Sequence, residues 1–278
     1  PGTLSSSFIS DSILYITGNA TLTGYETALQ SITYESSNTD PTVNYTSRTI
    51  TWTVTDADSD GAGSATSSNK YSSIDLEADN DKPELTTTNG ITTYTEDGTA
   101  AIIDNSITIS DVDDIELVSA TVTISSSEFT AGDTLILENP GSLDTTFSNN
   151  VLTITGTESL DNYRDALRSI TYQSSSDDPT KTTDTRIIDW QVTDANSDGA
   201  GAATSEIEQS TIEITASIDK PIVTINPLTT TYPENSNSIT ILNSISISDA
   251  DDDSLVSATV TISNGFTSGD TLILLNPG

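Results

Sequence analysis

The sequence predicts an all-β protein made of tandem Greek-key β-sandwich domains, each with one short helix. Long phrases recur 138 positions apart, so that residues 56–67 return at 194–205, and residues 117–125 return unchanged at 255–263. Short runs of alternating apolar and polar residues, bounded by Gly, Asn, Asp and Pro, follow one another along the chain. A fixed period of this kind is typical of an array in which one folding unit of about 138 residues is used repeatedly.

The strands are predicted from the alternation of apolar and polar side chains. Four runs between residues 120 and 192 have this pattern: residues 120–125, 134–137, 151–155 and 186–192. In the last run Trp190 shares a face with Ile188 and Val192, and Trp52 occupies the equivalent position in the first copy. We therefore expect both Trp side chains to belong to the core, and not to form platforms on which sugars stack.

The one helix of each repeat is predicted from a different spacing. In residues 159–167, Ser159 can cap the N-terminus, and apolar residues from Leu160 to Leu167 recur at helical intervals. Residues 21–29 are the equivalent segment of the first copy. We expect the helix to pack across one open end of the sandwich core.

Domain boundaries are predicted at two linkers that end in Lys-Pro, at residues 77–83 and 215–221. They make residues 82–219 one complete domain, residues 1–81 the C-terminal part of a domain, and residues 220–278 the N-terminal part of the next. Two arrangements remain open. The chain is either a stretch of a longer array, or a filament subunit that completes the open sheet edge of its neighbour by head-to-tail strand donation.

The charge of the chain excludes several functions. It has 42 acidic and 8 basic residues, for a formal net charge of −34, and it has no Cys and no His. Nucleic acid requires a basic surface, and no apolar run is long enough to cross a membrane, so we expect neither nucleic-acid binding nor membrane insertion. Hard divalent cations are the natural counter-ions, and the acidic composition without Cys favours an extracellular or cell-surface bacterial protein.

Many carboxylates recur at equivalent positions of the two copies of the repeat. Clustered like charges destabilise a fold unless they are offset, and calcium offsets them with six to eight oxygen ligands, often from Asp-x-Asp turns. The candidate ligands fall into three groups that recur 138 residues later. Asp56, Asp58 and Asp60 have the counterparts Asp194 and Asp198. Asp111 and Asp113 have the counterparts Asp249 and Asp251, and Glu96 has the counterpart Glu234. The alternative is that these residues are solvated and cap turns, as Asp and Asn commonly do.

These motifs resemble those of cadherin-like repeats. Residues 232–235, Tyr-Pro-Glu-Asn, resemble the family's glutamate motif near the domain start, and residues 77–83, Glu-Ala-Asp-Asn-Asp-Lys-Pro, resemble its linker. Asp-Val-Asp at 111–113 resembles its Asp-x-Asp motif, and residues 192–196 match its late motif more loosely. With the recurring phrases, nearly the whole chain is similar to cadherin-like (Ig-like) tandem repeats of giant bacterial extracellular adhesins.

The resemblance implies structural Ca²⁺ at the joints between domains. For the first joint it implies the ligands Glu77, Asp79 and Asp81 from the linker and Asp111, Asp113 and Asp194 from the following domain. The second linker departs from the pattern because it keeps only Asp219. Nearby candidates for that joint are Glu96, Asp249 and Asp251.

One loop has a competing assignment. Residues 56–61, Asp-Ala-Asp-Ser-Asp-Gly, fit the first half of an EF-hand calcium loop. The twelfth position is Ser67, and Ser205 in the copy, so the bidentate Glu of such a loop is missing. The sequence leaves open whether Asp194 serves this loop or the joint.

The sequence favours a structural function, as a spacer of a bacterial adhesin or extracellular filament that calcium makes rigid. Its partners would be neighbouring identical repeats, in the same chain or in other subunits, and any host or surface glycan would bind through other domains. The alternative is a glycan- or protein-binding module, which the inward-facing Trp residues disfavour. An enzyme is not expected, because the chain lacks His, Cys and a Gly-x-Ser-x-Gly phrase, and its paired carboxylates lie in loops.

Overall fold

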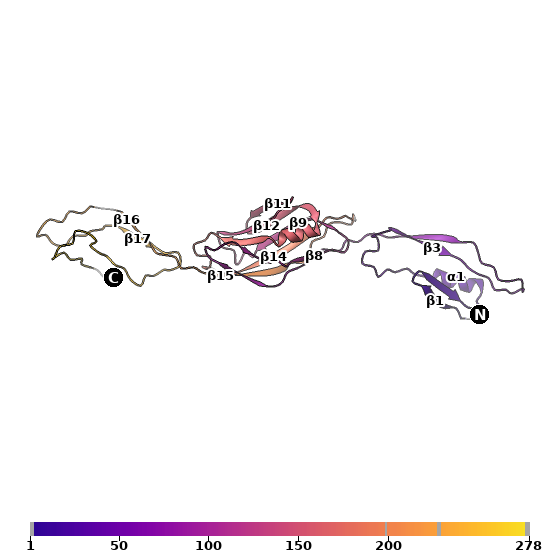
Figure 1. The fold of residues 1–278 in the computed structure, drawn as a ribbon. Coiled ribbons are helices and arrows are strands. Elements are labelled where there is room, and N and C mark those ends of the chain that lie inside the picture. The colour runs from indigo at the N-terminus through magenta and orange to yellow at the C-terminus, as the bar shows by residue number, and fades with distance from the viewer. Residues whose placement is uncertain (1–2, 198, 227–228, 276–278) are drawn as a thin grey trace. The chain divides into compact units, whose positions relative to one another are not determined.

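The computed structural model has the all-β fold that the sequence predicts (Figure 1). It describes residues 3–197, 199–226 and 229–275. Contacts between Cα atoms divide the chain into two compact units. The first unit holds the residues up to Asp81, with 111–114 and 196–203, and the second holds 82–110, 115–195 and the residues from Thr204 onward. The domain boundary predicted after Asp219 lies inside the second unit, so the three-part division stays a prediction.

The largest sheet of the second unit has six strands in the order β11–β12–β9–β14–β15–β6. Their bounds are β6 Ile91–Thr95, β9 Glu116–Ile124, β11 Asp144–Ser148, β12 Val151–Ser159, β14 Thr185–Asp194 and β15 Glu208–Thr215. Neighbouring strands are antiparallel, except that β15 and β6 run parallel. Strand β9 lies between β12 and β14, so that Val122 faces Leu152 on one side and Trp190 on the other.

A second layer closes the core. It contains a three-stranded sheet, β10–β13–β7, and the pair β5–β8. Their bounds are β5 Glu84–Thr86, β7 Ala101–Ile102, β8 Thr108–Ser110, β10 Asp133–Leu137 and β13 Ile170–Ser174. Tyr94 of β6 packs edge-on against Tyr172 of β13, with ring centroids 5.1 Å apart and planes at 88°, which joins the two layers. The buried apolar cluster includes side chains from both layers, as in a β-sandwich.

The strands predicted from alternation are confirmed, because all four runs fall within or overlap strands β9, β10, β12 and β14. Along β14, Ile188, Trp190 and Val192 are completely buried, as their shared face predicts. The indole N–H of Trp190 donates to Ser210 Oγ at 3.0 Å, so the polar atom of this core residue is satisfied. The expectation of a core position for Trp190 is therefore confirmed.

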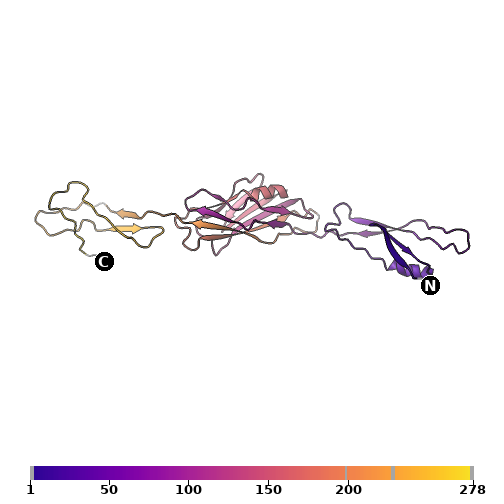
Figure 2. The same cartoon turned by 60° about the horizontal axis from the view of Figure 1, so that its bottom comes forward.

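Both predicted helices are present, at α1 Leu22–Gln30 and α2 Leu160–Leu167. Ser159 caps α2 by accepting the N–H of Asn162 at 3.2 Å, and Thr21 caps α1 in the same way. Helix α2 contacts β8, β9 and β12, and Figure 2 shows it lying beside the strands of the sandwich. It buries Tyr163, whose hydroxyl donates to the Gly156 carbonyl at 2.6 Å.

The remaining strands form separate two-stranded antiparallel sheets. In the first unit, β1 Ser5–Ser10 pairs with β2 Ile13–Thr17, and β3 Ser47–Trp52 pairs with β4 Lys70–Asp75. In the second unit, β16 Ile222–Ile225 pairs with β17 Ile245–Ser248. Trp52 repeats the contact of Trp190, with its N–H 2.7 Å from Ser72 Oγ, but it is only half-buried.

Candidate metal sites

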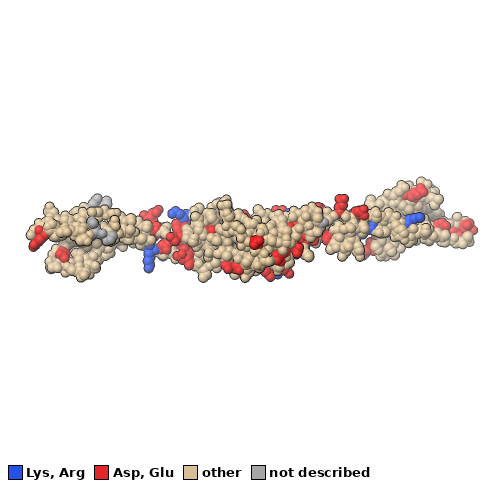
Figure 3. All heavy atoms as spheres, turned by 90° about the horizontal axis from the view of Figure 1, so that it is seen from above, with Lys and Arg blue, Asp and Glu red and all other residues tan. Residues whose placement is uncertain are grey.

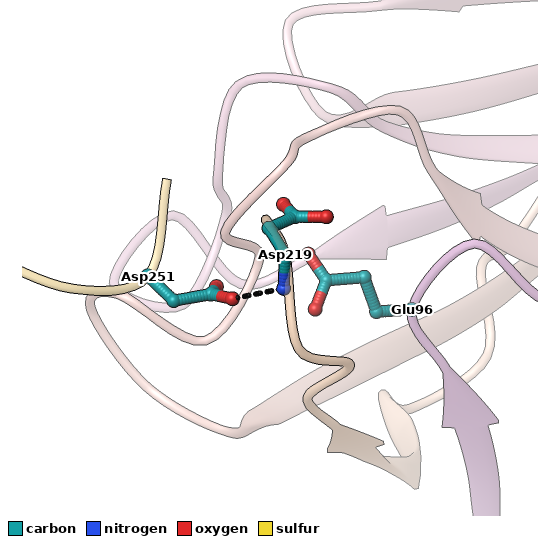
Figure 4. Close-up of side chains that lie close together, drawn as sticks. All are labelled: Glu96, Asp219 and Asp251. Carbon is teal, nitrogen blue, oxygen red and sulfur yellow. Dashed lines mark hydrogen bonds between the residues drawn. The ribbon is translucent and has the colours of Figure 1, made fainter. Parts of the chain in front are cut away.

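Three carboxylates from distant segments converge in the second unit: Glu96, Asp219 and Asp251 (Figure 4). One oxygen of each lies within 4.8 Å of the others. Glu96 and Asp219 meet because β6 and β15 run parallel, which brings the C-terminal ends of both strands to the same edge of the sheet. The backbone N–H of Glu96 extends this pairing by donating to the Thr215 carbonyl at 3.0 Å.

Glu96 is the buried member of this carboxylate cluster, with 3% of its surface exposed. Its Oε2 accepts the backbone N–H of Ser217 at 2.7 Å, whereas its buried Oε1 has no hydrogen-bond partner. Burial raises the pKa of Glu96, the nearby Asp251 and Asp219 carboxylates raise it further, and the Ser217 N–H opposes the shift. A buried carboxylate oxygen without a partner destabilises the fold, and a cation at this position would supply the missing partner.

The two aspartates are held by backbone hydrogen bonds. The N–H of Asp219 donates to Asp251 Oδ2 at 2.7 Å (Figure 4). Asp249 Oδ1 accepts the N–H groups of Asp251 at 3.1 Å and Asp252 at 3.0 Å, which closes the Asp-x-Asp turn. Loss of water around Asp219 raises the pKa of its carboxyl, and the Asp251 carboxylate adds to this effect.

The first linker repeats the same local geometry within the first unit. The N–H of Asp81 donates to Asp113 Oδ2 at 2.6 Å, and Asp111 Oδ1 accepts the N–H groups of Asp113 and Asp114, both at 3.0 Å. Partial burial raises the pKa of Asp113, the Asp81 N–H opposes this, and the Asp81 carboxylate adds to it. Within the part of the chain that the structure describes, no third carboxylate completes a group at metal-binding distance around Asp81 and Asp113.

The other predicted ligands are placed differently. Glu77, Asp79 and Glu234 are exposed. Asp194 is completely buried at the end of β14, where it pairs with Leu117 of β9. Asp198 lies outside the described residues, and the assignment of all these residues as calcium ligands stays a prediction.

The EF-hand-like loop uses its carboxylates to close its own backbone. Asp56, Asp58 and Asp60 each accept one backbone N–H of the loop through Oδ1, at 2.8, 2.7 and 3.1 Å. All three side chains are exposed. This is the geometry of turn-capping residues, and the second oxygen of each carboxylate remains available to a cation.

Asp114 is a buried carboxylate that was not predicted from the sequence as a site residue. It is 2% exposed, its Oδ1 accepts both the N–H of Ser197, at 2.9 Å, and the hydroxyl of that residue, and its buried Oδ2 has no hydrogen-bond partner. The sequence signal that could have identified Asp114 is that an aspartate, Asp252, occupies the equivalent position of the next repeat.

Most of the surface that Figure 3 displays belongs to residues without a charge, and the charged residues on it are mostly Asp and Glu, with few Lys and Arg. The chain matches no protein-family model, and no curated protein sequence matches it. The resemblance to cadherin-like repeats therefore rests on the motifs alone and stays a prediction. Among the described residues, no helix is long and apolar enough to cross a membrane.

Proposed function

We propose that this chain is a structural tandem repeat of a secreted or surface-anchored bacterial adhesin or extracellular filament, and that calcium at the joints between repeats makes it rigid. One observation carries the proposal. The buried Oε1 of Glu96 has no hydrogen-bond partner, and it lies in a cluster with Asp219 and Asp251. A hard cation offsets both the burial of this oxygen and the repulsion among the three carboxylates.

Calcium is the cation that the donors favour. The cluster offers only oxygen ligands, and the chain contains no Cys or His with which to hold a softer metal. Calcium accepts six to eight oxygens in flexible geometry, so backbone carbonyls and water can complete the shell. Sites of this kind in extracellular modules have dissociation constants of about 10⁻⁴ to 10⁻³ M, which suits the calcium concentrations outside cells.

Rigidity follows from where the ligands lie in the chain. Glu96 follows strand β6, Asp219 lies in the linker after β15, and Asp251 follows β17. An ion held by all three would tie the linker to the segments before and after it, and would remove rotational freedom from the linker backbone.

The glycan-binding alternative has less support. The indole ring of Trp190 is completely buried and its N–H is bonded to Ser210, so it offers no surface on which a sugar could stack. We propose no catalytic role for the carboxylates, whose function in this account is to hold the ion.

Calcium titration by calorimetry tests the proposal. The wild-type chain, freed of metal with EGTA and dialysed, is compared with Glu96→Gln and with Glu213→Gln, which removes an exposed carboxylate of β15. We expect the wild type and Glu213→Gln to bind calcium alike, and Glu96→Gln to lose one class of sites. Failure of the wild type to bind millimolar calcium, or unchanged binding by Glu96→Gln, contradicts the proposal.

A further inference from the structure

The complete sandwich, which strands β5 to β15 form, has a pocket that shares no residue with the carboxylate cluster. The pocket has a volume of about 350 Å³ and lies between the turn at residues 139–143, the end of β12 and helix α2. Pockets of about 300–1,000 Å³ are usual for small molecules. We infer that this pocket binds a neutral saccharide unit, without any part played by the calcium site or by Trp190.

The lining of the pocket combines apolar and polar side chains. Leu143 and Ala166 line it with apolar atoms, and both residues are buried. The polar side chains of the lining are those of Asn139, Ser142, Glu158, Asn162 and Asp165. A sugar ring has apolar C–H faces and hydroxyls around its edge, so it needs both kinds of contact, which this lining supplies.

Glu158 is held in place as an acceptor for hydroxyl groups. The Ser142 hydroxyl donates to its Oε1, and the Asn162 side-chain N–H donates to its Oε2 at 2.7 Å. These hydrogen bonds, first that of Ser142 and then that of Asn162, lower the pKa of Glu158 and keep the carboxyl ionised. Each carboxylate oxygen has a further lone pair, and a hydroxyl that donates to an ionised acceptor forms a stronger hydrogen bond than one to a neutral acceptor. Because the carboxylate is already oriented, a ligand loses less free energy in ordering it.

The amide side chains of the pocket complement the carboxylate. A sugar hydroxyl both donates and accepts, whereas a carboxylate only accepts. Asn139 and Asn162 each carry an amide with two donor hydrogens and one acceptor oxygen. The backbone N–H of Asn139 donates to Ser169 Oγ at 3.0 Å, which fixes the position of this residue at the pocket.

The charges around the pocket favour a neutral ligand. The ionised Glu158 repels anions. The Nε and Nη2 of Arg164 both donate to Asp165 Oδ1, at 3.0 and 2.9 Å, so the charge of Asp165 is offset and attracts a cation less. Among the described residues, the group of three carboxylates at metal-binding distance does not include Glu158 or Asp165.

The first copy of the repeat shows that the fold does not require these polar residues. The equivalents of Glu158, Asn162 and Asp165 are Ala20, Gly24 and Thr27. Helix α1 nevertheless forms with the same framework as α2. Its cap Thr21 accepts the N–H of Gly24 at 3.1 Å, and the Tyr25 hydroxyl donates to the Gly18 carbonyl at 2.8 Å, as Tyr163 does to Gly156. The polar groups of the pocket are thus an addition to the scaffold, as expected of a binding site that one repeat has and its neighbour lacks.

Titration of the isotope-labelled chain with sugars, followed by its amide NMR signals in EGTA, tests the inference. The probes are the neutral sugars glucose, galactose, mannose and N-acetylglucosamine, with the cation glucosamine and the anion glucuronate for comparison. We expect at least one neutral sugar to give saturable shifts at residues 139–143 and 158–166, and to bind more tightly than glucosamine and glucuronate.

The variants take their residues from the first copy, in which the helix forms. Glu158→Ala is expected to weaken binding by about tenfold or more, because it removes the ionised acceptor. Thr157→Asn, which changes the adjacent exposed residue to its first-copy equivalent Asn19, is the matched control and is expected to bind like the wild type. Asn162→Ala, at an exposed helix position that Ala favours, is also expected to weaken binding and serves as the test if Glu158→Ala does not fold.

Four results would overturn the assignment of a neutral saccharide to this pocket. They are the absence of saturable shifts with every neutral sugar, shifts confined to residues outside the pocket, tighter binding of glucosamine or glucuronate than of any neutral sugar, and equal affinities of the wild type and the folded Glu158→Ala or Asn162→Ala variant. Because calcium is absent, none of these results bears on the calcium proposal.

Discussion

The buried pair of Arg186 and Asp133 provides the sharpest test of how the complete sandwich is stabilised. Replacing Arg186 with Met keeps much of the apolar stem but leaves the Asp133 carboxylate buried without its cation. Removing one partner of a fully buried pair costs about 3–5 kcal/mol of unfolding free energy. Both side chains here are completely buried, which places the pair within that class.

Two contacts reduce the expected cost. After the substitution Asp133 still accepts the Tyr172 hydroxyl at 2.7 Å and the Thr130 N–H at 2.8 Å. Because these donors continue to stabilise the carboxylate, we expect Arg186→Met to destabilise the protein by about 3 kcal/mol, the lower end of the range. That loss corresponds to about a hundredfold larger unfolded population.

Urea unfolding followed by the fluorescence of Trp190, in a Trp52→Phe background, measures this loss. The double variant Arg186→Met/Asp133→Asn is expected to recover at least about 1 kcal/mol, because no buried charge remains. Arg164→Met is the control, since it removes a partly exposed Arg that pairs with carboxylates on helix α2 and is expected to cost less than about 1 kcal/mol. A loss below about 1 kcal/mol for Arg186→Met, or no recovery in the double variant, would show that the buried ion pair does not stabilise the sandwich in this way.

Three further predictions concern the helix cap and the carboxylate cluster. Ser159→Ala, which removes the acceptor for the Asn162 N–H, is expected to cost about 1 kcal/mol in thermal or urea unfolding, and an unchanged midpoint would contradict the capping role. Calcium at about 100 times its dissociation constant is expected to stabilise the wild type by about 2.7 kcal/mol and Glu96→Gln by less; equal shifts in the melting temperature would count against the site. In EGTA, stability is expected to fall as pH rises from the ordinary pKa of Glu through the raised pKa of Glu96, because the folded state there binds the proton more tightly than the unfolded state. Glu96→Gln is expected to flatten this dependence, and a wild-type stability that rises over that pH interval would contradict the pKa shift.

Local patterns in the sequence predicted much of the fold. Alternation located the strands and the inward face of Trp190, and Ser159 located the start of α2, because these features depend on neighbouring residues. The parallel pairing of β15 with β6 joins segments more than one hundred residues apart, and no local pattern encodes it. The approach of Glu96 to Asp219 depends on that pairing. Both residues were therefore predicted from the sequence as candidate ligands, but the proximity of their carboxylates was not.

The charge buried in the core was not predicted from the sequence. Arg186 lies on the inward face of its strand together with Trp190, a position where an unpaired guanidinium would be costly. Its recurrence as Arg48, and that of Asp133 as Asp270, was the signal that could have revealed the pair. Matching them from sequence requires knowing that β10 and β14 lie in facing layers, which is a property of the tertiary structure.

The distance between two spin labels measures directly whether calcium makes the joint rigid. The chain has no native Cys, so labels can be attached at Glu213→Cys in β15 and Ser246→Cys in β17, both of which are exposed positions. Pulsed electron paramagnetic resonance then gives the distribution of label distances in EGTA and in calcium. We expect a broad distribution in EGTA that calcium narrows, and no narrowing when Glu96 is replaced by Gln. A distribution of the same width with and without calcium in the wild-type background would show that calcium does not make the joint rigid.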